Sequence, residues 1–148
     1  MSGPSAPAIW EARNLVVAGA LAPLLVLTGA LGFALPPDWA LLSGRPAYNL
    51  FHIAGGLAGI ALVLRAGGRG AVGFNLAFGL IDLYQAVAGS VHLFPAALFA
   101  YRPLDDVLHV TLGLGLVGLG ALGWRRGMAG APAGGDPARG GSPGIGAI

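Results

Sequence analysis

The sequence contains no cysteine and no lysine. Without cysteine the chain can form no disulfide, no thiolate metal site and no cysteine nucleophile. Charge is also scarce, because 9% of the 148 residues are charged, against about 25% in an ordinary soluble domain. The eight arginines and six acidic residues form no basic run of the kind that binds nucleic acid. With 55% hydrophobic residues, too few polar side chains remain to cover a surface exposed to water.

Four long apolar runs dominate the chain. A helix needs about 20 apolar residues to cross the hydrocarbon core of a membrane, and each run approaches or exceeds that length. None alternates with a period of two, which disfavours a β-barrel. The sequence therefore predicts an all-α integral membrane protein, a four-transmembrane-helix bundle. Its helices are expected over Leu15–Leu35, Ala47–Leu64, Val72–Phe94 and Leu104–Gly123.

The remaining segments are short or of low complexity. Residues 1–13 are expected to be a short cytoplasmic N-terminus, and residues 14–126 the membrane domain. The connections at 36–46, 65–70 and 95–103 contain Pro, Gly and Arg, and their brevity forces neighbouring helices to be antiparallel. Residues 127–148 are rich in Gly, Ala and Pro. Such a segment cannot bury enough apolar surface to fold, so we predict a disordered cytoplasmic tail.

Arginine is distributed unevenly among these segments. Six arginines fall in the N-terminus, the second connection and the C-terminus, and two fall in the first and third connections. Because cytoplasmic segments carry the excess of positive charge, both termini are expected in the cytoplasm and the protein in the inner (plasma) membrane. The six are Arg13, Arg65, Arg69, Arg125, Arg126 and Arg139, and the two are Arg45 and Arg102.

Aromatic residues flank the apolar runs, as in the aromatic belts of membrane proteins. Trp10, Trp39 and Trp124 lie just outside the runs, and Tyr48 and Tyr101 lie at the outer edge. We therefore expect all five at the level of the lipid headgroups.

An internal repeat relates the two halves of the membrane domain. The second predicted helix contains Asn49, His52 and Gly56, and the fourth contains Asp106, His109 and Gly113, with the common pattern N/D-x-x-H-x-x-x-G. The first and third helices both open with Asn-Leu, at Asn14 and Asn75. The chain is thus expected to be two tandem helical hairpins, related by an axis along the membrane normal.

These motifs resemble a bacterial family of small four-helix membrane proteins that is catalogued as domain of unknown function 4383. The resemblance covers about Arg13 to Trp124. It is carried by the Asn-Leu openings and the two histidine motifs. The family more typically has Asp-Asn before its second histidine, where this chain has Asp105-Asp106. The resemblance implies the four-helix fold and no assigned activity.

A polar stripe follows one face of the third predicted helix, because its members are spaced three and four residues apart. They are Asn75, Phe78, Asp82, Gln85, Gly89 and His92. Lipid offers polar groups no hydrogen-bond partner, so this face should turn to the bundle interior. We expect Asp82, Gln85 and His92 to form a polar seam there. Asp82 lies near the midplane, where a carboxylate costs about 2.5–3.5 kcal/mol.

His52 and His109 are expected at equal depth, about 7–8 Å inside the outer boundary, because each lies five residues into its run. Two roles fit such a pair. The imidazoles could form interhelical hydrogen bonds with Asn49, Asp106 or loop carbonyls. Alternatively, the pair could bind haem b or a divalent metal.

The sequence contains no recognisable catalytic motif, since HExxH, Walker A and GxSxG are all absent. The leading hypothesis is a structural or accessory membrane protein that has no catalytic activity or cofactor of its own. The alternatives are haem or metal binding by the histidine pair, and a proton or ion pathway along Asp82, Gln85 and His92. The expected partners are the lipid bilayer and either a second copy or another membrane protein, with no nucleic acid.

The arginine distribution generates a topology prediction. Reporter fusions made after Arg69 and after Arg126 should both report a cytoplasmic position, and a fusion after Arg102 should report the opposite side. Alkaline phosphatase and fluorescent protein fusions measure this in complementary ways. A signal from the outer side at either of the first two positions would contradict the predicted orientation.

Overall fold

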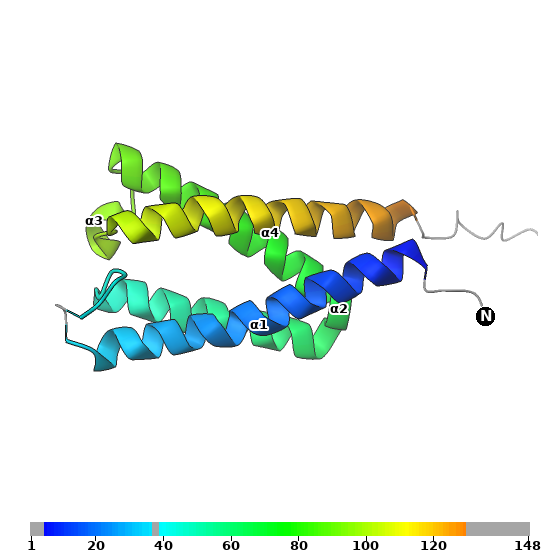
Figure 1. Ribbon diagram of the computed structural model, residues 1–148, viewed down its shortest axis with the longest axis horizontal. Coiled ribbons are helices and arrows are strands. Elements are labelled where there is room, and N and C mark those ends of the chain that lie inside the picture. Colours follow the sequence, from blue (N-terminus) through cyan, green and yellow to red (C-terminus); the bar gives the residue numbers. More distant parts are fainter. Residues whose placement is uncertain (1–4, 37–38, 130–148) are drawn as a thin grey trace, which may run out of the picture.

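A computed structural model describes residues 5–36 and 39–129, and within them the chain is helical with no strand (Figure 1). The elements are α1 (Ala6–Ala34), α2 (Pro46–Val91), α3 (Ala96–Phe99) and α4 (Pro103–Ala129). Residues 130–148, which make up most of the predicted tail, lie outside this description.

Three of these helices, α1, α2 and α4, are long and apolar enough to cross a membrane. The sequence predicts four such helices, and the difference lies in α2. This helix has 46 residues, and Gly67 in its middle has non-helical angles of φ 54° and ψ −132°. Figure 1 shows that α2 reverses its direction there. It therefore consists of two helical limbs, 46–66 and 68–91, which meet at Gly67.

The helices also extend further than the apolar runs. The first helix begins at Ala6 rather than Leu15, and α4 continues past Arg125 and Arg126 to Ala129. Charged residues end a hydrophobic run, but alanine, glutamate and arginine are good helix formers, so the backbone hydrogen bonds continue beyond it. In the expected connection 95–103, the structure adds the single turn of α3.

The four helical limbs run back and forth between two ends of the molecule. The start of α1, the bend of α2 and the end of α4 lie at one end (Figure 1). Because the bend of α2 is at Gly67, we call this end the Gly67 end. The segment 39–45, α3 and the start of α4 lie at the other end, the α3 end. Helix α2 packs against both α1 and α4, and α1 also contacts α4.

The apolar core joins α1, both limbs of α2, and α4. Phe74 and Phe78 stack with their ring centroids 5.4 Å apart, and Phe51 of the first limb stacks on Phe78 at 6.1 Å. A Cβ atom at Gly59 would lie 2.6 Å from the Phe74 ring, so this position requires glycine for the close approach. The buried core residues are Ala18, Leu21, Ala22, Leu25, Ala71, Phe74, Phe78 and Leu116.

The reversal in α2 depends on the left-handed backbone of Gly67, and this generates a stability prediction. A Cβ atom at Gly67 would meet no neighbour, so a Gly67→Ala change acts through backbone strain alone. We expect it to lower the free energy of unfolding by about 1–3 kcal/mol. Thermal unfolding in detergent, followed by circular dichroism, measures the effect.

Gly73 provides a matched control, because it lies within the second limb and its surroundings are equally open. There, alanine is the better helix former, so Gly73→Ala should leave stability unchanged or raise it by up to about 1 kcal/mol. Equal melting temperatures for the two variants would contradict the assignment of strain to Gly67.

Candidate functional site

A buried group of polar side chains fills the α3 end of the bundle. They come from the segment 39–45, both limbs of α2, the segment after α3, and α4. We call this group the polar cluster. Its members are Ser43, Tyr48, His52, Gln85, Tyr101, Asp105 and His109.

Asp105 lies at the centre of the polar cluster and is fully buried. Its Oδ1 atom accepts a hydrogen bond of 2.7 Å from the Tyr48 hydroxyl. Its Oδ2 atom accepts bonds from the backbone N–H groups of Ser43, at 2.9 Å, and Arg102, at 2.7 Å. Such charge-assisted bonds are stronger than neutral ones, so one carboxylate joins three segments of the chain.

The local sequence places Asp105 correctly for this role. Pro103 occupies the first position of α4, where its missing N–H costs nothing. Asp105 is the third residue of the helix, and its side chain reaches back to the N–H of the residue before the helix, as in a capping box. The positive end of the helix dipole also favours a negative charge there.

Further bonds fix the segment 39–45 over the polar cluster. The Ser43 hydroxyl donates to the carbonyl of Phe99, and the guanidinium of Arg102 donates to the carbonyl of Ala40. The Tyr48 ring packs edge-on against Phe99, with centroids 5.6 Å apart. The connection between α1 and α2 is therefore part of the packed structure of this end.

The two histidines lie in the polar cluster, with exposed fractions of 7% for His52 and 4% for His109. Both contact the Tyr48 ring, with centroid distances of 4.2 Å and 6.3 Å. The Nδ1 atom of His52 bonds to the Tyr48 carbonyl, at 2.9 Å, within its own helix. Neither ring nitrogen of His109 has a hydrogen-bond partner in the part of the chain that the structure describes. The tie between α2 and α4 comes instead from Tyr48 and Asp105.

Asp82 and Gln85 both lie buried on the second limb of α2. The Oε1 atom of Gln85 accepts a bond of 3.1 Å from the Tyr101 hydroxyl. Gln85 Nε2 and Asp82 Oδ2 are buried without a partner among residues 5–36 and 39–129. The hydroxyl of Thr111 in α4 donates to the carbonyl of Val107 in its own helix.

Tyr101 interacts both with the seam residue Gln85, through a hydrogen bond, and with the charge of Asp105. Burial is the main cause that raises the pKa of its hydroxyl above the ordinary value, and the negative charge of Asp105 raises it further. Tyr101 therefore stays neutral at physiological pH and can donate its proton to Gln85. This tyrosine and Tyr48, which the sequence predicts at the headgroup level, both pack into the polar cluster, and Tyr48 is almost fully buried.

His92 departs from the predicted seam. The helix ends at Val91, and His92 takes a left-handed conformation with φ 58°, so the helical spacing no longer determines where its side chain points. It is exposed and lines a pocket of about 250 Å³ together with Tyr101 and Asp106. The Oδ1 atom of Asp106 is buried there without a partner in the described segments.

The motif glycines each pack a helix against the preceding limb. A Cβ atom at Gly56 would lie 2.5 Å from the carbonyl oxygen of Ala22 in α1. One at Gly113 would lie 3.0 Å from the carbonyl oxygen of Gly79 in α2. Asn49 packs against Gly32 of α1, where an added Cβ would overlap its side chain.

A second polar contact lies toward the Gly67 end. Asn75 Nδ2 donates to Asn14 Oδ1 at 2.9 Å, and both side chains are fully buried. Asn14 Nδ2 donates in turn to the carbonyls of Trp10, at 2.9 Å, and Leu119, at 3.2 Å. This contact ties α1 to the second limb of α2 and to α4.

The repeat pattern read from the sequence did not identify the central pair of the site. It aligned the repeats on Asn49 and Asp106, whereas the residues that bond to each other, Tyr48 and Asp105, come one position earlier. A usable signal was present, because each of these residues precedes its histidine by four positions, one turn of a helix.

The positions of these side chains can be compared with the two ligand hypotheses, a divalent metal or haem b bound by His52 and His109. Within residues 5–36 and 39–129, no group of three or more His, Cys, Asp or Glu side chains could hold a metal ion. A haem held by both His52 and His109 would have to share its space with the Tyr48 ring, which contacts both imidazoles. Comparisons with protein-family models, curated proteins and solved structures found no match.

The hydrogen bonds of Asp105 generate a paired prediction. Asp105→Ala leaves two backbone N–H groups and the Tyr48 hydroxyl buried without an acceptor, at about 1–3 kcal/mol for each group. We expect the free energy of unfolding to fall by at least about 3 kcal/mol. Denaturation of the purified protein in detergent measures this.

Asp106→Ala removes the same chemical group from the next residue, whose Oδ1 atom makes no hydrogen bond. It should change the free energy of unfolding by less than about 1 kcal/mol. Similar losses for the two variants would show that Asp105 has no special part in holding the α3 end together.

Proposed function

We propose that this chain is a four-span integral membrane protein of the plasma membrane, with both termini in the cytoplasm. The reversal at Gly67 supports four spans, because each limb of α2 has more than 20 residues and a helix of that length reaches about 30 Å. The arginines support the orientation. Arg13, Arg65, Arg69, Arg125 and Arg126 belong to segments at the Gly67 end, and Arg45 and Arg102 belong to segments at the α3 end.

We propose further that the two hairpins are repeats. Asn14 and Asn75 occupy equivalent positions and bond to each other, and so do Tyr48 and Asp105. Contacts between equivalent residues are expected near an axis that relates two repeats, so these pairs support the idea. Membership in the family catalogued as domain of unknown function 4383 belongs to the same proposal.

The proposed role is structural or accessory, without catalytic activity. The observation that carries it is the Asp105 carboxylate, which accepts three hydrogen bonds from three segments. A carboxylate bound in this way is held in one geometry and has little freedom for proton transfer. Asn14 and Asn75 are used in the same manner, to tie helices together.

A specific observation favours a second candidate, a proton pathway. Asp82 Oδ2, Gln85 Nε2 and both nitrogens of His109 are buried without partners in the described ranges. Such groups are normally satisfied by water, and a chain of water and titratable groups can carry protons. Toward the Gly67 end, however, the apolar core with Phe74 and Phe78 follows this region. A pathway across the whole bundle would therefore also have to pass this apolar core.

One variant separates the two candidates. Asp82→Asn replaces a buried acid by an amide of the same shape, so in a structural protein the thermal stability should stay the same or rise. Vesicles that contain the wild-type chain should then respond to a pH step no faster than vesicles without protein. A pH-sensitive dye inside the vesicles measures this rate.

Glu11→Gln is the matched control, because Glu11 is an acid near the Gly67 end and outside the seam. A proton flux that is present in the wild type, lost in Asp82→Asn and retained in Glu11→Gln would overturn the structural role. The same result would establish the proton pathway.

A further inference from the structure

We propose that the groove between α1 and α4 at the Gly67 end binds an anionic phospholipid. The guanidinium of Arg13 binds the phosphate of the headgroup, and one acyl chain continues from there into the membrane over Val16 and Val17. The inference rests on the membrane insertion proposed above and adds to it a binding site of defined chemistry.

The groove has a volume of about 620 Å³ and an apolar lining. Six of its seven lining residues have no polar side-chain atom, and Val16 is 72% exposed, so nothing in the described chain covers it. Five of them lie on one face of α1, over about two and a half turns. Val16 and Val17 follow Arg13 by about one turn toward the middle of α1, where an acyl chain would lie below its headgroup. The six are Ala8, Ile9, Ala12, Val16, Val17 and Leu119.

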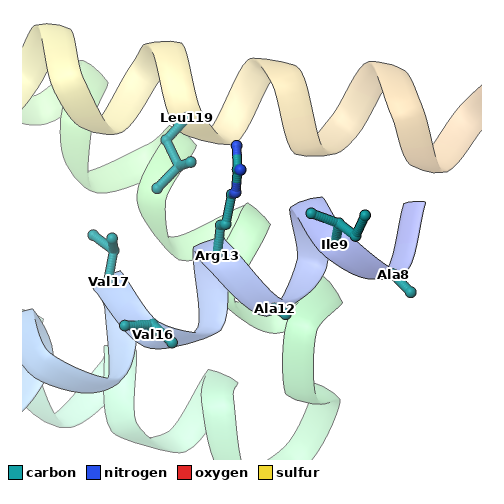
Figure 2. Close-up of a pocket in the computed structure, with 7 residues that line it drawn as sticks. All are labelled: Ala8, Ile9, Ala12, Arg13, Val16, Val17 and Leu119. Atoms are coloured by element: carbon teal, nitrogen blue, oxygen red, sulfur yellow. The ribbon is translucent and has the colours of Figure 1, made fainter. Parts of the chain in front are cut away.

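Arg13 is the one charged residue that lines the groove. Figure 2 shows its side chain rising from α1 toward α4, beside Leu119. Its guanidinium lies 4.7 Å from the centroid of the Trp10 ring, a cation–π contact at a level where tryptophan marks the headgroup region. Arg13 makes no ion pair with an acidic side chain in the described part of the chain, and a planar guanidinium matches phosphate oxygens in a bidentate manner.

The surrounding charge selects an anionic headgroup. Four further arginines, Arg65, Arg69, Arg125 and Arg126, belong to segments at the same end. Of the acids in residues 5–36 and 39–129, Glu11 alone belongs to a segment at that end. Basic pockets between transmembrane helices on the cytoplasmic side are typical sites for anionic lipids. A second copy of the chain, packed in parallel on this groove, would bring two arginine-rich ends together. Charge repulsion therefore favours the lipid as occupant.

The test uses the full chain, purified in a neutral detergent, with phosphatidylglycerol and phosphatidylcholine of identical acyl chains. Native mass spectrometry counts the bound lipids. We expect the wild type to retain phosphatidylglycerol in preference to phosphatidylcholine, and Arg13→Gln to reduce that preference by at least about fivefold, as loss of a charge-assisted hydrogen bond implies. Arg69→Gln removes the same charge at the same end but outside the groove, so it should lower the preference far less than Arg13→Gln does.

A second variant tests the apolar half of the site. Ala12→Trp fills the groove while Arg13 is kept, and it should lower the binding of both lipids. Soluble glycerol 3-phosphate carries the headgroup chemistry without acyl chains, so it should not displace the bound lipid.

Several results would overturn the inference. These are equal binding of the two lipids by the wild type, equal losses in Arg13→Gln and Arg69→Gln, displacement by glycerol 3-phosphate, or a chain that is dimeric through this face. A chain that is recovered in the soluble fraction without detergent would instead refute the proposed membrane insertion. The two failures are therefore distinguishable.

Discussion

The Asp105 carboxylate holds the α3 end of the bundle together. It accepts hydrogen bonds from Tyr48 of α2, from Ser43 before α2, and from Arg102 at the start of α4. These segments would otherwise end in separate connections with unsatisfied backbone groups, which are costly in a membrane. Because the Tyr48 ring also contacts both histidines, the same bond sets the positions of His52 and His109.

In the middle of the bundle, close apolar packing holds the helices together in place of hydrogen bonds. Small residues allow the helices to approach closely, and Phe74 and Phe78 fill the space between the two limbs of α2 and α1. In the membrane insertion proposed above, lipid tails are as apolar as the core, so burial alone would give little drive for helix association. Close packing at glycine and the Asn14–Asn75 contact supply it instead. The helices are thus joined by polar contacts toward both ends and by close contact between them.

The buried polar side chains fall into two groups, those that have a hydrogen-bond partner within the described chain and those that do not. Asn14, Asn75 Nδ2 and Asp105 find acceptors or donors within the chain. The unpartnered atoms of Asp82, Gln85 and His109 find none among residues 5–36 and 39–129, and these residues lie on the second limb of α2 and on α4. The bundle therefore combines a carboxylate that accepts three hydrogen bonds with buried polar atoms that have no partner in the described part of the chain.

Composition and periodicity by themselves determined the helical class, the apolar runs and the buried face that includes Asp82 and Gln85, because these depend on local spacing and on the cost of polar groups in lipid. They also singled out the two histidines. Tertiary structure decided that α2 doubles back at one glycine, that His92 leaves the seam beyond the helix end, and that Asp105 rather than Asp106 is central. The spacing to the histidine pointed to Asp105, but only the positions of Tyr48 and Ser43 in space show that they donate to it and not to Asp106.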